Sequence, residues 1–186
     1  MRLISGEYKG RILKTGKGPG YRPATGKVRE SLFSMLESRV PEWPEMTVLD
    51  VFAGSGSLGL ETLSRGAGSA LFIEKSFQAC AIIKENISIL GISPKRARVK
   101  KTDALSFLSR PGEIPFDLVF IDPPYGMDMV VPAINMLMDS NLLNEKGLIS
   151  AEVEAFLAID TQFHPDLKLV KDRLFGQTRI LIWSRK

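Results

Sequence analysis

From residue 47 onward, short apolar runs alternate with longer segments whose apolar residues recur every three or four positions. The runs predict buried strands at residues 47–52, 70–73, 97–100, 116–121 and 147–153. The longer segments predict helices at residues 57–64, 77–90, 103–108 and 129–138. Because strands and helices alternate, the expected fold class is α/β, with a mostly parallel sheet covered by helices on both faces.

Further details of the pattern refine this sheet. The run at residues 97–100 is less apolar than the others, so we expect it near an edge. Runs at residues 167–174 and 179–183 follow each other without a helix, which predicts an antiparallel C-terminal hairpin and a total of seven strands. In the helix at residues 77–90, the side chains expected to face inward are Ala81, Ile82, Ile83, Ile87 and Leu90.

The first forty residues form a different kind of segment. Glycines and short apolar pairs over residues 1–20 predict short strands and turns, and the apolar spacing predicts an amphipathic helix at residues 25–38. We therefore expect a small N-terminal extension over residues 1–40, with a short β-hairpin and a helix, and a main domain over residues 41–186.

Positive charge is concentrated in this extension. Residues 1–30 contain eight Lys and Arg residues against two Glu, whereas the rest of the chain carries a small net negative charge. Local positive charge favours a polyanionic partner, since each phosphate contact releases condensed counterions. A nucleic acid is one interpretation of this segment, and a solvated basic arm without a partner is the other.

Length and composition limit the remaining choices. The chain has 186 residues, of which 44% are hydrophobic, as expected for one globular domain with a small appendage. No apolar run approaches the ~18 residues that span a membrane, and the N-terminus lacks an apolar signal core. Cys80 is the single cysteine, which excludes an internal disulfide and a Cys-rich zinc site. We expect a cytoplasmic protein without a metal ion.

A glycine-rich turn follows the first strand of the main domain. Gly54, Gly56 and Gly59 match G-x-G-x-x-G, a pattern that lets backbone N–H groups approach a pyrophosphate or an amino-acid carboxylate. Asp50 lies four residues before the first glycine, where its carboxylate would oppose a pyrophosphate but attract an ammonium group. S-adenosylmethionine (SAM) carries an ammonium, a sulfonium and no phosphate, so the loop favours SAM over NAD.

Two further acidic residues follow successive strands. Glu74 ends the second strand, at the distance from the glycine loop where a carboxylate binds a ribose. Asp103 follows the third strand, where a carboxylate could accept a hydrogen bond from an adenine amino group. Together with Asp50 they form a set at the carboxyl ends of the strands, which is where ligands bind in open α/β sheets.

The sequence Asp122-Pro123-Pro124-Tyr125 follows the strongly apolar fourth strand. Two prolines fix the backbone and remove two donors, which leaves the Asp122 side chain and the Pro123 carbonyl as acceptors. Tyr125 adds a flat aromatic face on which a base can stack. These groups suit an exocyclic amino group on a planar base, whose two N–H bonds would meet two acceptors while its lone pair attacks a methyl group.

At these motifs the chain resembles the bacterial RsmD-type 16S ribosomal RNA (guanine-N2)-methyltransferase family, which has the Rossmann-like class I methyltransferase fold. The segments that carry the resemblance are GEYKGRILKT, YRPATGKVRESLFSML, VLDVFAGSGSLGLETLSRGA, FIEKSFQACAIIKENI, TDALSFL and FDLVFIDPPYG. The resemblance implies methyl transfer from SAM to one guanine of 16S RNA during assembly of the 30S subunit, by an enzyme we expect to be monomeric. It implies a cofactor site made of Asp50, Phe52, Gly54, Gly56, Glu74, Asp103 and Ala104, and a catalytic site made of Asp122, Pro123 and Tyr125.

The N-terminal extension carries the expected RNA contacts. The candidates are Arg11, Arg22, Thr25, Lys27 and Arg29. The family pattern usually has a hydroxyl residue where Ala24 stands and an Asp where Gly26 stands, so contacts made by those side chains elsewhere are in doubt here. For Lys27 and Arg29 the alternative is that they solvate the helix.

Other functions stay open at this point. An adenine-N6 methyltransferase would use the same chemistry, although it would normally carry a target-recognition domain for which this chain has no room. A dehydrogenase is disfavoured by Asp50 and by the segment beginning at Asp122. A non-catalytic RNA-binding assembly factor would keep the basic extension but would need neither Asp122 nor the glycine loop.

Overall fold

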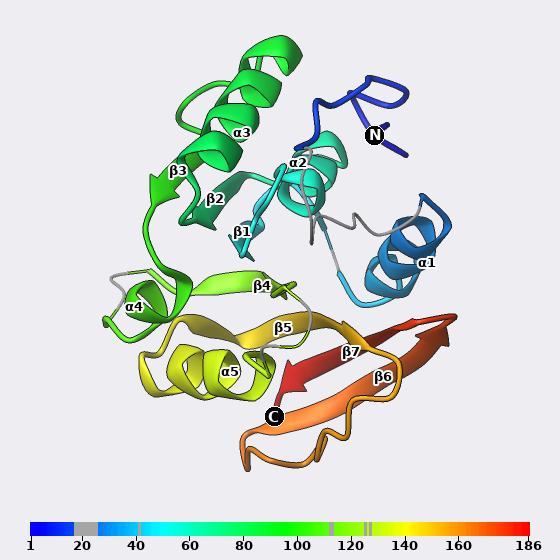
Figure 1. Ribbon diagram of the computed structural model, residues 1–186, viewed down its shortest axis with the longest axis vertical. Coiled ribbons are helices and arrows are strands. Elements are labelled where there is room, and N and C mark those ends of the chain that lie inside the picture. The colour runs from blue at the N-terminus through cyan, green and yellow to red at the C-terminus, as the bar shows by residue number, and fades with distance from the viewer. Residues whose placement is uncertain (17–25, 41, 112–113, 125, 127) are drawn as a thin grey trace.

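A computed structural model describes residues 1–16, 26–40, 42–111, 114–124, 126 and 128–186 (Figure 1). The helices are α1 (Gly26–Glu37), α2 (Ser57–Ser64), α3 (Phe77–Leu90), α4 (Ala104–Leu108) and α5 (Val130–Asp139). The strands are β1 (Thr47–Val51), β2 (Ser69–Glu74), β3 (Ala97–Lys101), β4 (Phe116–Ile121), β5 (Leu143–Glu154), β6 (Leu167–Phe175) and β7 (Thr178–Arg185). No helix in the described part of the chain is long and apolar enough to cross a membrane.

The seven strands form one sheet in the order β3-β2-β1-β4-β5-β7-β6. Strands β1 to β5 pair in parallel, whereas β7 pairs antiparallel with both β5 and β6. The predicted α/β fold, the edge position of β3 and the C-terminal hairpin are therefore confirmed. This is the sheet arrangement of the class I methyltransferases.

Helices cover both faces of the sheet (Figure 1). On one face, α1, α2 and α3 bury side chains such as Phe33 and Ile83 against Phe72 and Phe120. On the other face, α4 and α5 pack on the same strands through a second apolar cluster that includes Ile134. Each buried strand thus has apolar contacts on both sides, which explains its nearly continuous apolar sequence.

The inward face of α3 differs in part from the predicted one. Ile83 and Leu90 are buried as expected, but Ala81 is exposed. The buried face of the helix also includes Cys80 and a polar residue, Asn86. The sequence pattern placed only apolar residues on this face, whereas Asn86 is buried because it has hydrogen-bond partners there.

The N-terminal segment packs on the same face of the sheet. One antiparallel bridge between Arg2 and Ile12 closes it, which is a shorter pairing than a regular hairpin. Leu3 and Leu13 are buried in the apolar cluster that also contains Phe33 of α1. The segment therefore shares its core with the main sheet, and the division after residue 40 stays a prediction.

The register of the central strands determines which residues meet at the carboxyl edge. Val51, the last residue of β1, lies opposite both Ile73 of β2 and Ile121 of β4. Ile121 in turn lies opposite Ala151 of β5. The residues that follow Val51 and Ile121 therefore leave the sheet next to one another, between β1 and β4, where the order of connections reverses.

Candidate active site

The glycine-rich loop joins β1 to α2 at the carboxyl edge of the sheet. Gly54 and Gly56 have positive φ angles of 55° and 77°, a conformation that glycine adopts without steric cost. Phe52 also has a positive φ, 62°, which is strained for a bulky residue and is found mainly at ligand sites. Gly59 has a packing role instead, because a Cβ atom there would lie 2.4 Å from the ring of Phe72.

Asp50 lies inside β1, directly below this loop. Only 2% of the residue is exposed, and its Oδ2 accepts a hydrogen bond from the Gly59 backbone N–H at 2.9 Å. Burial raises the pKa of Asp50 to about 7, while the Gly59 hydrogen bond lowers it and the charge of Glu74 raises it further. A ligand cation beside Asp50 would favour the ionised carboxylate. The environment of Asp50 therefore suits a positively charged ligand.

Glu74 and Asp103 occupy the ends of the next two strands. The Glu74 carboxylate accepts hydrogen bonds from the backbone N–H groups of Gly54 at 2.9 Å and of Ser76 at 2.8 Å. Asp103 caps α4, and its Oδ1 accepts from the Ser106 N–H at 2.9 Å. This hydrogen bond is the main cause of the lowered pKa of Asp103. Both carboxylates thus hold the loops that would surround a cofactor.

The strand order β3-β2-β1 brings the predicted cofactor residues to one edge of the sheet. They are Asp50, Phe52, Gly54, Gly56, Glu74, Asp103 and Ala104. Their contacts with a ligand stay predictions. Within the described residues, His, Cys, Asp and Glu form no group that could hold a metal ion.

Asp122 leaves β4 beside the glycine loop. It follows Ile121, which pairs with Val51 at the end of β1, and the residue is half-buried. Burial raises the pKa of Asp122 well above its usual value, and the charges of Glu152 and then of Asp50 raise it further. A carboxylate with a raised pKa is a stronger proton acceptor than an exposed one.

The turn after Asp122 is held by the neighbouring strand. Pro123 is buried and Pro124 is exposed, whereas Tyr125 lies outside the described residues. The Gly126 backbone N–H donates a hydrogen bond to Oε1 of Glu154 at 2.8 Å. The end of β5 therefore fixes the backbone of this turn at Gly126.

Sequence reasoning missed the contribution of β5 to the site. Glu152 and Glu154 are two residues apart in this strand and alternate with the buried Ala151 and Val153, so they share one face. A signal was present, because acidic side chains are rare within a strand that is otherwise apolar. The sequence could not show that these side chains lie beside Asp122, because that depends on the pairing of β4 with β5.

The predicted RNA-contacting residues are spread over the N-terminal region. Arg11 lies at the surface and donates a hydrogen bond from Nη2 to the backbone carbonyl of Ile89 at 2.8 Å. Lys27 is exposed on the first turn of α1. Arg22 and Thr25 lie outside the described residues.

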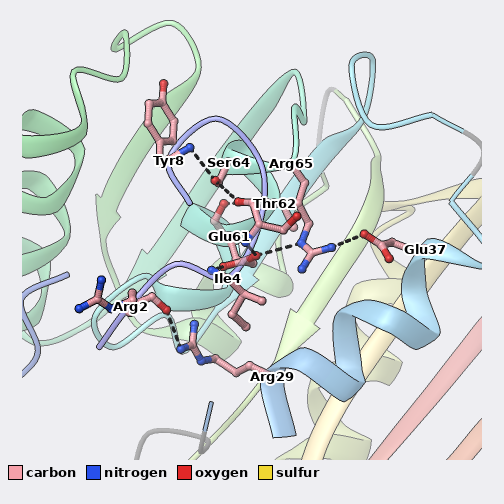
Figure 2. Close-up of polar contacts among 11 residues, drawn as sticks. Arg2, Ile4, Tyr8, Arg29, Glu37, Glu61, Thr62, Ser64 and Arg65 are labelled. Carbon is pink, nitrogen blue, oxygen red and sulfur yellow. Dashed lines mark hydrogen bonds and ion pairs between the residues drawn. The ribbon is translucent and has the colours of Figure 1, made fainter. Parts of the chain in front are cut away.

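Arg29 is placed differently from its neighbours. It is buried, with 3% of the residue exposed, and its Nη2 donates a hydrogen bond to the Arg2 carbonyl at 3.0 Å (Figure 2). Together with Arg2 and Lys9 it lines a hollow of about 610 Å³ between the N-terminal segment and α1. The idea that Arg29 merely solvates the helix is therefore wrong, and its contact with RNA stays a prediction.

Comparisons with known proteins agree with this site. Residues 1–184 match the family described as Conserved hypothetical protein 95. The chain is 36% identical over 186 residues to ribosomal RNA small subunit methyltransferase D of Escherichia coli strain K12, covering 100% of this chain and 90% of that protein. It is 38% identical over 155 residues to the protein of the same name in Haemophilus influenzae, covering 83% of this chain and 79% of the relative.

A solved structure supports the same relationship. The yhhF protein of Escherichia coli superposes with a TM-score of 0.86 at 35% identity, covering 100% of this chain and 98% of that one. Sequence match, fold and the arrangement of the two loops at the β1–β4 edge thus agree. The chain belongs to the Conserved hypothetical protein 95 family, the RsmD-type methyltransferases that its sequence motifs indicated.

Proposed function

We propose that this protein transfers a methyl group from SAM to the N2 amino group of one guanine in 16S ribosomal RNA. The observation that carries the proposal is the adjacency of two loops. Pairing of Val51 with Ile121 puts the glycine loop after β1 next to Asp122 after β4. A methyl donor bound in the first loop and a base held by the second would meet between them.

The first loop supplies the cofactor site. Asp50 would hold the ammonium group of the donor, since a nearby cation favours the ionised form of its buried carboxyl. Glu74 binds the ribose and Asp103 the adenine, as their places at the next two strand ends allow. When bound, SAM supplies an electrophilic methyl group on its sulfonium.

The second loop holds the base. The Asp122 carboxylate and the Pro123 carbonyl accept the two N–H bonds of the guanine amino group, which directs the nitrogen lone pair toward the methyl carbon. As the new N–C bond forms and the S–C bond breaks, positive charge develops on N2. The carboxylate stabilises this charge and takes the proton that N2 loses, a role for which its raised pKa suits it.

The N-terminal region binds the RNA. Arg11 and Lys27 are exposed, and each phosphate contact that they make would release counterions. The helix α1 covers the same face of the sheet on which Asp50 lies, with Phe33 packed against Phe120. The substrate is the RNA of a small subunit or its assembly intermediate in the bacterial cytoplasm, and the enzyme acts as a monomer.

Transfer of a labelled methyl group tests this proposal. Small subunits isolated from cells that lack the protein are incubated with labelled SAM and enzyme, and nucleosides from the RNA are then separated. We expect label in N2-methylguanosine, and label in N6-methyladenosine would indicate the adenine alternative.

The matched variants are Asp122→Ala and Asp128→Asn. Asp128 is an exposed acid just beyond the same turn, with a positive φ of 42° that Asn tolerates. Asp122→Ala should reduce transfer at least a hundredfold with SAM binding kept, and Asp128→Asn should leave it unchanged. Normal transfer by Asp122→Ala would contradict the catalytic assignment.

A further inference from the structure

Asn86 is a fully buried polar residue that joins the N-terminal segment to the cofactor loop. It lies in α3 and none of its surface is exposed. Its Oδ1 accepts a hydrogen bond from the Lys14 N–H at 2.8 Å, and its Nδ2 donates to the Lys14 carbonyl at 3.0 Å. The same Nδ2 donates to the Ser55 carbonyl at 3.1 Å. Three of the hydrogen-bonding positions of one amide are thus used to connect two distant parts of the chain.

Both partners belong to functional segments. Ser55 lies between Gly54 and Gly56 and is itself buried, so its carbonyl is part of the backbone that would surround the cofactor. Lys14 lies near the end of the described N-terminal segment, which carries Arg11, one of the residues proposed to contact RNA. A change in the position of either backbone must alter the hydrogen bonds that Asn86 makes to the other, because one planar amide group makes all three.

The rest of the N-terminal segment is fixed separately. Glu61 of α2 is fully buried and accepts hydrogen bonds from the N–H groups of Ile4 at 2.8 Å and Ser5 at 3.0 Å (Figure 2). Arg65 holds the same carboxylate at 3.0 Å and also pairs with Glu37 of α1. Residues 4 and 5 therefore stay on α2 when the contact at Lys14 changes, and Asn86 acts on the part of the segment next to the loop.

We propose that Asn86 is a positioning residue that couples the N-terminal segment to the cofactor loop, so that the methyl donor and the RNA bind with positive cooperativity. This inference rests on the proposed function. When the cofactor fixes the loop at Ser55, the amide of Asn86 is held in the orientation that binds Lys14. The basic segment is then ordered before the RNA arrives, and less ordering remains to oppose RNA binding. By linkage, RNA strengthens cofactor binding by the same factor.

The test compares the affinity of the protein for small subunits with and without saturating S-adenosylhomocysteine, the demethylated product. Subunits come from cells lacking the protein, and sedimentation measures binding. Asn86→Ala removes all three hydrogen bonds. Glu85→Gln is the matched control, because it removes the exposed ion pair between Glu85 and Lys14 on the neighbouring position of α3 while leaving the amide in place.

In the wild-type protein we expect S-adenosylhomocysteine to raise subunit affinity about tenfold, within the usual range of coupling between sites. In Asn86→Ala this ratio should fall to about one, and in Glu85→Gln it should stay near the wild-type value. A merely structural Asn86 would lower the melting temperature without changing the ratio, and that result would overturn the proposal.

Hydrogen exchange in the wild-type protein gives a second test that needs no variant. S-adenosylhomocysteine should slow exchange of the Lys14 amide at least threefold. Exchange of the Thr47 amide, which donates a hydrogen bond to Asp117 at the amino end of β1, should stay unchanged. Equal exchange of the Lys14 amide with and without ligand would overturn the coupling. A wild-type protein that binds neither S-adenosylhomocysteine nor subunits would overturn the proposed function itself, and this inference with it.

Discussion

Replacement of Asp50 by Asn tests how the site recognises a cation. The amide has nearly the shape of the carboxyl, and its oxygen can still accept the hydrogen bond from Gly59. The variant therefore removes a buried charge while keeping the contact that fixes α2. Two effects of opposite sign follow, one on the stability of the free protein and one on cofactor binding.

The stability effect follows from the pKa of Asp50. Burial raises this pKa from 3.8 to about 7, so ionising the carboxyl costs about 4 kcal/mol more in the folded protein than in the unfolded chain. Because the folded pKa is raised, the contribution of Asp50 to stability is present below pH 4 and is lost as the pH rises through 7. The free energy of unfolding of Asp50→Asn should therefore match that of the wild type near pH 4. It should exceed the wild-type value by up to about 4 kcal/mol at pH 8.

Urea unfolding at several pH values measures this difference. Asp172→Asn is the control, because the partner Arg179 lowers the pKa of Asp172. Removing the Asp172 charge should therefore decrease stability by a small amount above pH 4. Calorimetry with S-adenosylhomocysteine measures the second effect. Loss of a charge-assisted hydrogen bond of about 1.5–3 kcal/mol should weaken binding about tenfold to a hundredfold. A stability difference that does not change with pH would contradict the raised pKa of Asp50, and an unchanged affinity would contradict its contact with the ammonium group.

Two further predictions concern the catalytic carboxyl and the RNA. In Glu152→Gln, removal of a negative charge lowers the pKa of Asp122, so the acidic limb of the pH–rate profile should move to lower pH; an unmoved profile would mean that Asp122 does not limit the rate. Replacing Arg11 and Lys27 by Gln together should reduce the salt dependence of subunit binding by about two units of slope; an unchanged slope would place the RNA elsewhere.

Most of the sheet could be predicted because each central strand is a mainly apolar run. The helices at residues 57–64 and 77–90 have the predicted bounds, since Gly56 and Ser76 precede them and Gly91 ends the second with a φ of 68°. The strand β5 begins earlier than predicted, at Leu143. Its first residues are partly polar and exposed, so no apolar pattern marked them.

The residues that connect the site could not be predicted in the same way. Glu61 was indistinguishable from a solvated residue on a short helix, yet it is fully buried. Arg65, one helical turn away, is one partner, but the others are backbone N–H groups more than fifty residues away, and backbone groups leave no trace in a sequence. Asn86 is similar, because its burial depends on where Lys14 and Ser55 meet in space.

The acidic residues at the strand ends lie between these cases. Asp50, Glu74 and Asp103 could be proposed as a set because they lie at or near the carboxyl ends of three successive strands. Asp122 could be recognised by the prolines after it. Glu152 could not be recognised, because its position beside Asp122 depends on the pairing of β5 with β4.

Mass spectrometry of 16S ribosomal RNA from cells with and without this protein tests guanine-N2 methylation most directly. We expect one N2-methylguanosine to be absent when the protein is absent and to return when the wild-type protein, but not Asp122→Ala, is supplied. An unchanged set of methylated nucleotides, or loss of a methyl group from a nucleotide other than guanosine, would contradict it.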